Sequence, residues 1–291
     1  MTWAIPAKTF LLGEYLALEG GPALVLTTTP CFEVGLSREQ TSSVIHPDSP
    51  AGLFWEKSRK DVELTWHDPY HGIGGLGASS AQFLGAYWAS HSPWDQNALL
   101  KAYWDCSWQK GCGVRPSGYD VLAQASSGCV YLHGHTQKPV SYNWPFKDIA
   151  FILLHTGDKL PTHEHLQTIR LAKVMNALSS IVLSGKEAFE GANSEQLIDA
   201  VKRYHLALTA LNLVANRTQE QLMQLMSDQD VLACKGCGAM GADVLLVLVP
   251  MHQRLICEKR FNLAGWPVLA TSNDLYDKNN EKNPNRMQFT S

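Results

Sequence analysis

A glycine-rich stretch near residue 75 constrains the chain most. Four glycines fall within six residues from Gly72 to Gly77, and the run from Ala78 to Leu84 can start a helix. Glycine admits backbone conformations with positive φ, and the bare N–H groups of a helix N-terminus attract anions. The stretch therefore predicts a phosphate-binding loop followed by a helix. The alternative is a tight glycine loop that only reverses the chain.

Two hydroxyls fall in the first turn of this predicted helix, on Ser79 and Ser80. A side-chain oxygen at this place can bind a phosphate-bound Mg²⁺ or cap the helix. The same letters also spell G-x-G-x-x-G, but the dinucleotide fingerprint requires a strand directly before it, and here Pro69 intervenes. A second match, Gly236–Gly241, runs into an apolar segment typical of a strand. A nicotinamide-dependent oxidoreductase is therefore a disfavoured interpretation.

The charge of the chain argues against nucleic acid or an anionic membrane as a partner. The formal net charge is -3 over 291 residues, whereas such partners usually require clustered Lys and Arg. No apolar run approaches the length of a membrane span. We expect a small-molecule partner, no nucleic acid and no membrane.

The cysteines indicate a reducing compartment. Seven cysteines make an odd set scattered along the chain, and Met1–Pro6 does not resemble a signal peptide. This pattern favours reduced thiols and a cytoplasmic protein. Cys234 and Cys237 form a C-x-x-C pair, which we place inside the second glycine loop, so redox or metal use is the minority interpretation.

The coarse pattern of elements is α+β, with strands in the first half and helices in the second. Short apolar runs separated by Gly and Pro predict strands at the beginning of the chain. Leu53–Trp66 alternates charged and apolar residues, which predicts the arm of a hairpin. The length predicts two domains, and a buried strand beginning at Asp148 places their boundary after Pro145. We therefore expect domains at residues 1–146 and 147–291.

Three isolated charges have two interpretations each. Lys8 is the only cation in the first 37 residues, and by itself it is most simply a solvated surface charge. Asp120 follows a Ser-Gly turn, where it can cap the next segment or present a carboxylate to a site, and local reasoning favours the cap. Arg115 can meet an anionic group on a ligand or lie at the surface, and both remain open.

Four separated segments together resemble the GHMP small-molecule kinases, in particular the mevalonate-pathway branch. In that branch the first segment reads A-P-G-K-x-x-x-x-G-E-Y/H, the second G-L-G-S-S-A, and the third K-x-[ST]-G-A-G-G-G-[DG]. The matching segments of this chain, with an S-G-x-D element as the fourth, are Ile5–Tyr15, Gly75–Ala81, Lys235–Asp243 and Pro116–Asp120. The resemblance implies a two-domain α+β GHMP kinase fold, with a ribosomal-protein-like N-terminal domain and an α/β C-terminal domain.

The resemblance also implies an activity, namely ATP-dependent phosphorylation of phosphomevalonate or mevalonate, with the first slightly favoured. It implies ATP and Mg²⁺ as cofactors and is compatible with a homodimer. Asp120 would act on the reacting oxygen of the acceptor, and Lys8 would supply positive charge beside it. Phosphoryl transfer depends mainly on such positioning and charge neutralisation.

Further residues receive roles from the same resemblance. The nucleotide phosphates would lie against Gly75, Leu76, Gly77, Ala78, Ser79 and Ser80. The metal ligands would be Ser79 and Gln109. The acceptor would contact Lys8, Glu14, Arg115, Ser117, Gly118, Gly238 and Ala239.

Some departures from the family pattern define an alternative. Met240 and Ala242 replace glycines of the third segment, and a Cβ near a phosphate restricts how closely the backbone approaches. Gln109 stands where mevalonate kinases have a glutamate, and an amide is a poorer ligand for a hard cation. Gln109 and Asp243 are more similar to phosphomevalonate kinases. The alternative function is a degenerate homologue that binds nucleotide without turnover.

Overall fold

Two antiparallel sheets organise the computed structural model, which describes residues 1–38, 45–58, 62–90, 95–110, 113–157, 175–238 and 243–279. The first sheet has the strand order β1-β2-β4-β5, and β3 pairs with the far half of β2. Its strands are β1 (Thr2–Leu12), β2 (Ala23–Ser37), β3 (Glu63–His67), β4 (Cys129–Leu132) and β5 (Val140–Tyr142).

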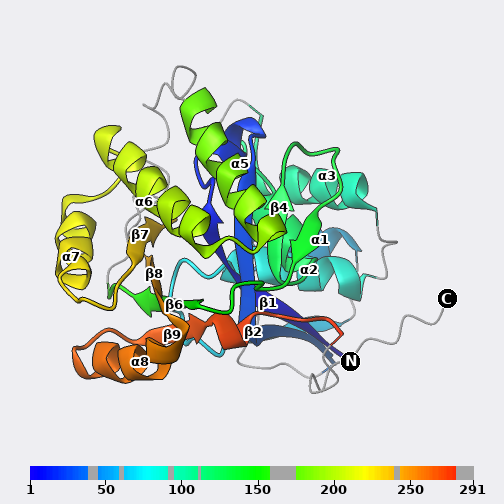
Figure 1. Cartoon of the computed structure of the whole chain (residues 1–291). Helices are drawn as coiled ribbons and strands as arrows, with labels where there is room; N and C mark the ends of the chain where they lie inside the picture. The colour runs from blue at the N-terminus through cyan, green and yellow to red at the C-terminus, as the bar shows by residue number, and fades with distance from the viewer. Residues whose placement is uncertain are drawn as a thin grey trace.

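Helices cover both faces of the first sheet. One face carries α1 (Pro50–Ser58), α2 (Ala78–Ala89), α3 (Gln96–Ser107) and α4 (Tyr119–Gln124), and α2 contacts both β1 and β2 (Figure 1). On the other side lies α5 (Met175–Gly191), which approaches closely at Gly185. A Cβ at Gly185 would lie 2.6 Å from Cδ1 of Leu12, so the absence of a side chain permits this packing.

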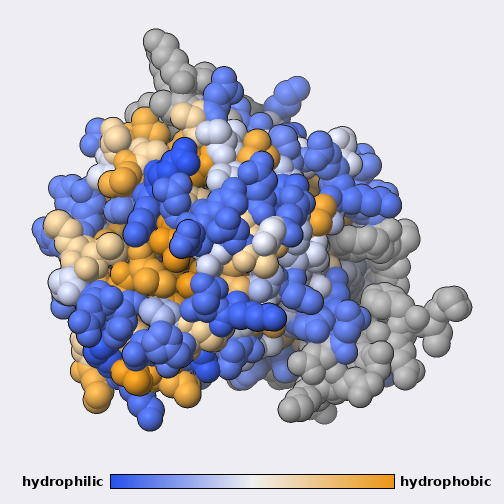
Figure 2. Space-filling model, in the orientation of Figure 1, coloured by the Kyte–Doolittle hydropathy of each residue, from blue (hydrophilic) through white to orange (hydrophobic). Residues whose placement is uncertain are grey.

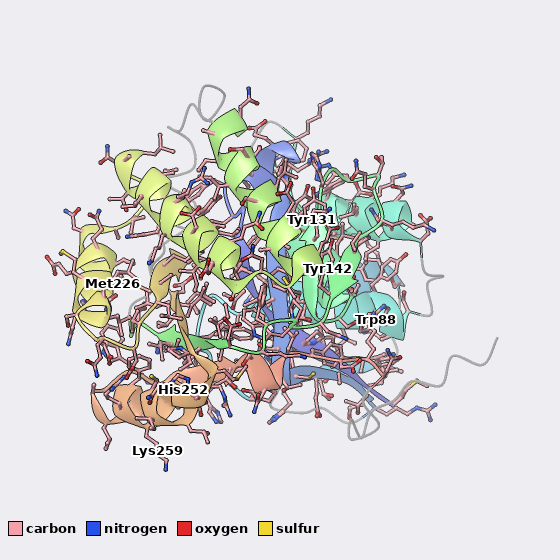
Figure 3. The ribbon with its side chains drawn as sticks, in the orientation of Figure 1. Trp88, Tyr131, Tyr142, Met226, His252 and Lys259 are labelled. Carbon is pink, nitrogen blue, oxygen red and sulfur yellow. The ribbon has the colours of Figure 1, made fainter. Side chains whose placement is uncertain are left out.

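The C-terminal end of α5 is fastened to the edge of the first sheet. Tyr142 of β5 donates a hydrogen bond to Oε1 of Glu190 at 3.0 Å, and Lys186 pairs with the same carboxylate at 2.7 Å. The Lys186 ammonium also lies 5.5 Å from the ring centre of Tyr131. Figure 3 shows Tyr131 and Tyr142 side by side next to this end of α5.

The second sheet has the order β7-β8-β6-β9. Its strands are β6 (Ile149–His155), β7 (Ala233–Cys237), β8 (Val244–Pro250) and β9 (Val268–Thr271). α6 (Ser194–Ala210) and α7 (Asn216–Met226) pack against β7, while α8 (Arg254–Leu263) contacts β6, β8 and β9. Short 3-10 helices are η1 (Leu16–Glu19), η5 (Met251–Gln253) and η6 (Ser272–Asp274). The apolar residues of β6 and β8 are buried, which explains their uninterrupted hydrophobic sequences. The face shown in Figure 2 is mostly hydrophilic, and its larger hydrophobic area lies where Figure 1 draws β7 and β8.

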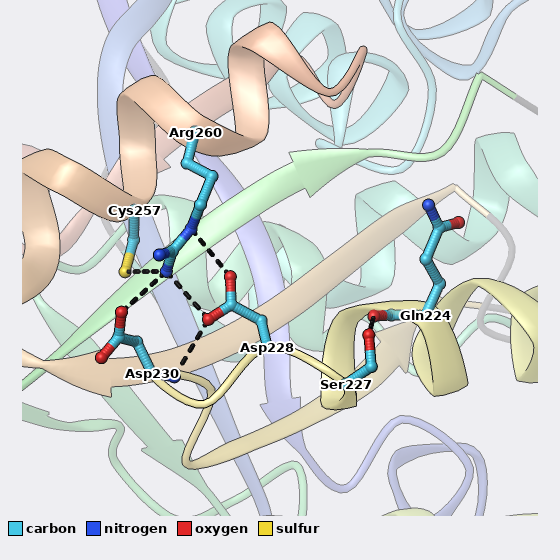
Figure 4. Close-up of polar contacts among 6 residues, drawn as sticks. All are labelled: Gln224, Ser227, Asp228, Asp230, Cys257 and Arg260. Atoms are coloured by element: carbon cyan, nitrogen blue, oxygen red, sulfur yellow. Dashed lines mark hydrogen bonds and ion pairs between the residues drawn. The ribbon is translucent and has the colours of Figure 1, made fainter.

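An arginine on α8 ties this helix to the connection between α7 and β7. The Arg260 guanidinium pairs with Asp228 at 2.8 Å and with Asp230 at 2.9 Å, and it also donates to the sulfur of Cys257 at 3.3 Å (Figure 4). The guanidinium thus contacts both its own helix and the α7–β7 connection, and it stabilises the packing of α8 against the second sheet.

The segment after β9 crosses back to the first sheet. Leu275 forms a β-bridge with Thr28, and the Tyr276 N–H donates to the carbonyl of Thr27 at 2.9 Å. The N–H of Gly128 in turn donates to the carbonyl of Tyr276 at 2.7 Å. The two sheets divide between β5 and β6, where the sequence places its boundary, and the division into domains remains a prediction.

The α+β class is confirmed, but two local predictions are wrong. Leu53–Trp66 contains most of α1 and most of β3 rather than one hairpin arm, because Phe54 of α1 packs against Phe83 of α2. The pair Cys234 and Cys237 lies in strand β7, not in a glycine loop. Both thiols are free, and no helix in the described ranges has the length and apolar character needed to cross a membrane.

Candidate functional site

Lys8 and Asp120 form an ion pair near the surface. Nζ of Lys8 lies 3.0 Å from Oδ1 of Asp120, and the two side chains are 11% and 34% exposed. Lys8 belongs to β1, and Asp120 lies in the first turn of α4. The N-cap of α4 is Gly118 with φ of 75°, so the local prediction that Asp120 caps this segment is wrong. The carboxylate instead faces the one cation of the N-terminal strand.

The glycine loop closes directly over this pair. The Lys8 N–H donates to the carbonyl of Leu76 at 2.9 Å, and Gly77 is the N-cap of α2 with φ of 82°. A Cβ at Gly77 would lie 2.8 Å from Cγ of Lys8, so the loop touches the lysine side chain without a gap. The ion pair and the N-terminus of a 12-residue helix therefore belong to one site.

The two hydroxyls at the start of α2 have different surroundings. Ser80 is buried, and its Oγ donates to the carbonyl of Gly77 at 3.0 Å, within the first turn. Ser79 is exposed at the same helix end, beside Ala78. Of the two, Ser79 has the hydroxyl that a ligand can reach.

Replacement of Gly77 tests the close contact between the loop and Lys8. We expect Gly77→Ala to destabilise the fold by more than the ~1–2 kcal/mol that a left-handed conformation costs an ordinary residue, because the new Cβ also meets Lys8. Gly72→Ala is the matched control, since Gly72 has φ of 86° and nothing within 4 Å of an added Cβ. Urea unfolding of both variants measures the difference. Equal destabilisation by both would contradict the contact.

The third segment meets the glycine loop through Asp243. A Cβ at Gly75 would lie 2.6 Å from Cβ of Asp243, and one at Gly238 would lie 3.7 Å from Oδ2 of the same aspartate. Gly238 has φ of 82° and directly precedes residues 239–242, which include Ala239 and lie outside the described residues. Segments from the two sheets are thus adjacent at the glycine loop.

The loop that precedes Asp120 is held by side chains from α3 and the β4–β5 connection. Nε1 of Trp104 donates to the carbonyl of Pro116 at 2.8 Å, and Nε2 of His135 lies 2.9 Å from the carbonyl oxygen of Ser117. The Ser117 hydroxyl accepts a bond from the N–H of Tyr119 at 3.2 Å. These contacts fix the approach to α4, so the position of the carboxylate does not depend on a free loop.

Two further predicted site residues are exposed. The Arg115 guanidinium stacks 4.1 Å from the ring centre of Trp104 and remains exposed. Gln109 is exposed just beyond the end of α3. The structure therefore brings together Lys8, Asp120 and the glycine loop. Arg115 lies over an aromatic ring in the segment that leads to Asp120.

Glu14 has a partner that sequence reasoning missed. Its carboxylate lies 2.8 Å from Nζ of Lys235, and the two side chains are 5% and 0% exposed. Burial raises the pKa of Glu14, although Lys235 acts in the opposite direction. Burial opposes the charge of Lys235, but the neighbouring Cys237 and Glu14 outweigh it and raise the pKa of the lysine. The pair connects the end of β1 with β7, and so one sheet with the other.

Comparisons with known proteins bear on the fold. No family model and no curated protein matches the chain. Among solved structures, it is similar to Streptococcus pneumoniae phosphomevalonate kinase in complex with phosphomevalonate and AMPPNP, with a TM-score of 0.75 and 17% identity over 93% of this chain and 99% of that one. It is also similar to Methanococcus jannaschii mevalonate kinase, with a TM-score of 0.72 and 13% identity over 95% and 98% of the two chains. Lactococcus lactis galactokinase complexed with galactose gives a TM-score of 0.72 and 12% identity over 93% and 92%.

The chain has the fold of the GHMP small-molecule kinases. This confirms the α+β GHMP kinase fold that the four sequence segments imply, whereas its division into two domains stays a prediction. At such identities the likeness concerns the fold alone, so the roles of individual residues depend on the geometry described above.

The donor set of this GHMP fold suits a nucleotide-bound Mg²⁺. Within the described residues, no three His, Cys, Asp or Glu side chains gather as a metal site. Mg²⁺ in nucleotide sites is typically held by phosphate oxygens and water with one or two protein ligands. The exposed hydroxyl of Ser79 fits such a single contact, and Asp243 lies against Gly75 of the same glycine loop.

Proposed function

We propose that this protein is a small-molecule kinase that transfers the γ-phosphoryl group of ATP to a hydroxyl of a small acidic acceptor. Phosphomevalonate is the favoured acceptor, and mevalonate is the second. The observation that carries the proposal is the ion pair of Lys8 and Asp120, 3.0 Å apart, directly beneath the glycine loop at the N-terminus of α2.

Each group of the site has a task in such a transfer. The N–H groups at the start of α2 and the Ser79 hydroxyl bind nucleotide phosphate, as helix N-termini do. Asp120 accepts the hydrogen bond of the acceptor hydroxyl and orients its oxygen for in-line attack. Lys8 neutralises charge that develops on the transferred group. Mg²⁺, when bound with the nucleotide, supplies further neutralisation of the phosphate oxygens.

The proposed acceptor class is based on the exposed cation in the segment that leads to Asp120. The Arg115 guanidinium lies over the ring of Trp104, so its position is restricted before a ligand arrives. A planar guanidinium with several donors suits carboxylate or phosphate oxygens. An anionic acceptor fits this arrangement better than a neutral sugar such as the galactose bound by one protein of the same fold.

An acceptor panel tests the proposal. Purified protein is incubated with Mg-ATP and, separately, phosphomevalonate, mevalonate and galactose, and acceptor-dependent ADP release is measured. We expect the highest kcat/KM with phosphomevalonate and none above background with galactose. Absence of ADP release with both mevalonate-pathway acceptors would reject the proposed activity. Calorimetric binding of ATP in that case would favour a nucleotide-binding homologue without turnover, which the neutral Gln109 and the altered third segment motivate.

Arg115→Ala separates acceptor binding from nucleotide binding. Loss of a charge-assisted contact typically costs about 1.5–3 kcal/mol, so we expect the KM of the anionic acceptor to rise roughly 10- to 150-fold. The KM of ATP should change less than threefold. Arg203→Ala is the matched control, because Arg203 pairs with Asp199 on the surface of α6. An unchanged acceptor KM would remove Arg115 from the acceptor site.

A further inference from the structure

A buried amide side chain joins three of the segments that make up the site. Gln124, the last residue of α4, is completely buried. Its Nε2 donates to the carbonyl of Pro6 at 2.8 Å and to the carbonyl of Gly77 at 3.1 Å. Pro6 lies two residues before Lys8 on β1, and Gly77 caps α2. One NH₂ group therefore connects the helix of Asp120 with the strand of Lys8 and with the glycine loop.

The orientation of this amide is fixed by its partners. Both partners are carbonyl oxygens, so only the NH₂ group can face them, and a flipped amide would place three acceptors together. The other end, Oε1, is buried and makes no hydrogen bond within the described residues. A buried polar atom without a partner costs free energy. The two hydrogen bonds that Nε2 makes must therefore offset the cost of the unsatisfied Oε1.

We propose that Gln124 is a positioning residue, whose buried amide sets the distance between the glycine loop and the Lys8–Asp120 pair. The inference rests on the proposed function of that pair. Two contacts of Lys8 depend on the same position of the glycine loop relative to β1. The N–H of Lys8 donates to the carbonyl of Leu76, and its side chain contacts Gly77. Loss of the amide donors leaves the buried carbonyl of Pro6 without this bond. It also removes the link to the carbonyl of Gly77, which then keeps only its bonds from Ser80 and Ala81 within the first turn of α2, and the loop shifts relative to Lys8.

Gln124→Met tests the inference, because methionine has a similar length and no donor. Gln219→Met is the control, because the side chain of Gln219 also donates to a backbone carbonyl, that of Val214 at 3.0 Å. Gln219 lies on α7, which packs against the second sheet and not against the site. The first readout needs no catalysis: hydrogen exchange of the Lys8 amide, followed by NMR. We expect exchange about 10- to 100-fold faster in Gln124→Met and unchanged in Gln219→Met.

The second readout is the kinetic split on the preferred acceptor, at a temperature where both variants are folded. We expect kcat to fall about 10- to 100-fold in Gln124→Met, with the KM of ATP and of the acceptor within threefold of wild type. In a Lys8→Met background the same change should lower kcat less than threefold further, because the two residues act through one geometry. If Gln124→Met does not fold, Gln124→Asn replaces it, since its shorter amide cannot reach both carbonyls.

Either of two results would overturn the inference: unchanged exchange of the Lys8 amide, or a fall in kcat that is fully additive with Lys8→Met. If wild type phosphorylates no acceptor, the proposed function fails by itself. The exchange measurement then still decides whether Gln124 holds the loop against Lys8.

Discussion

Asp120→Asn is expected to lower kcat by roughly 10²- to 10⁴-fold, the usual contribution of a positioned acid–base group. The amide keeps the size of the side chain but cannot accept the proton of the acceptor hydroxyl. The nucleotide is expected to contact α2 and the glycine loop rather than α4, so the dissociation constant of ATP should stay within threefold of wild type. Steady-state ADP release and calorimetry measure the two quantities on the same preparation.

Asp199→Asn is the matched control for this variant. Asp199 also pairs with a cation at 3.2 Å, but on the exposed surface of α6, and its loss should leave kcat unchanged. A loss of less than tenfold in Asp120→Asn would contradict a direct role on the acceptor. A parallel loss of ATP affinity would assign the carboxylate to the nucleotide instead.

Predictions from local sequence differ most from the structure where tertiary contacts determine the environment of a side chain. Taken alone, Lys8 is a surface charge and Asp120 a helix cap, yet the fold places them 3.0 Å apart. Their approach depends on the packing of α4 against α2 and β1, which no periodicity along the chain encodes. The family resemblance brings the two together, because it compares whole segments and not single residues.

Tertiary contacts also explain why the local sequence predicts the secondary structure of residues 50–58 incorrectly. Leu53–Trp66 alternates as a strand does, but Phe54 packs at 5.3 Å from the ring of Phe83 and 5.7 Å from that of Tyr87. These aromatic contacts favour a helix, and tertiary packing of this kind overrides propensity. By contrast, the glycine-rich run gives the start of α2 directly, because only glycine suits the left-handed residue at position 77.

The interior ion pair was beyond prediction for another reason. Glu14 and Lys235 are distant in sequence, and neither has a local pattern that indicates burial. The lysine interrupts an apolar strand, which is the one signal that could have drawn attention to it. A charge within such a strand requires a partner, and the partner is known only once the two sheets are assembled.

Glu14→Gln is expected to destabilise the fold by about 3–5 kcal/mol, as removal of one partner of a buried ion pair typically does. The reason is that Lys235 would keep its charge without a counter-ion while completely buried. Urea unfolding at neutral pH measures the loss. Asp199→Asn, which breaks an exposed pair, should cost less than about 1 kcal/mol under the same conditions.

The double variant Glu14→Leu with Lys235→Met tests whether the ion pair itself stabilises the fold or whether only the loss of one partner is harmful. Removal of both charges abolishes their desolvation cost, so most of the stability lost in Glu14→Gln should return.

The pH dependence of stability gives an independent check of the charge on Lys235. Because the pKa of Lys235 is raised above its ordinary 10.5, its contribution is fully present below that pH and is lost as the pH rises through the raised value. On the alkaline side, the stability gap between wild type and Glu14→Gln should therefore narrow only above pH 10.5. On the acid side the gap should narrow as well, because burial raises the pKa of Glu14 and its protonation makes wild type resemble the glutamine variant. A gap that is already closed at neutral pH would show that the buried pair carries no charges in the fold, and that the contact between Lys235 and Glu14 is an ordinary hydrogen bond.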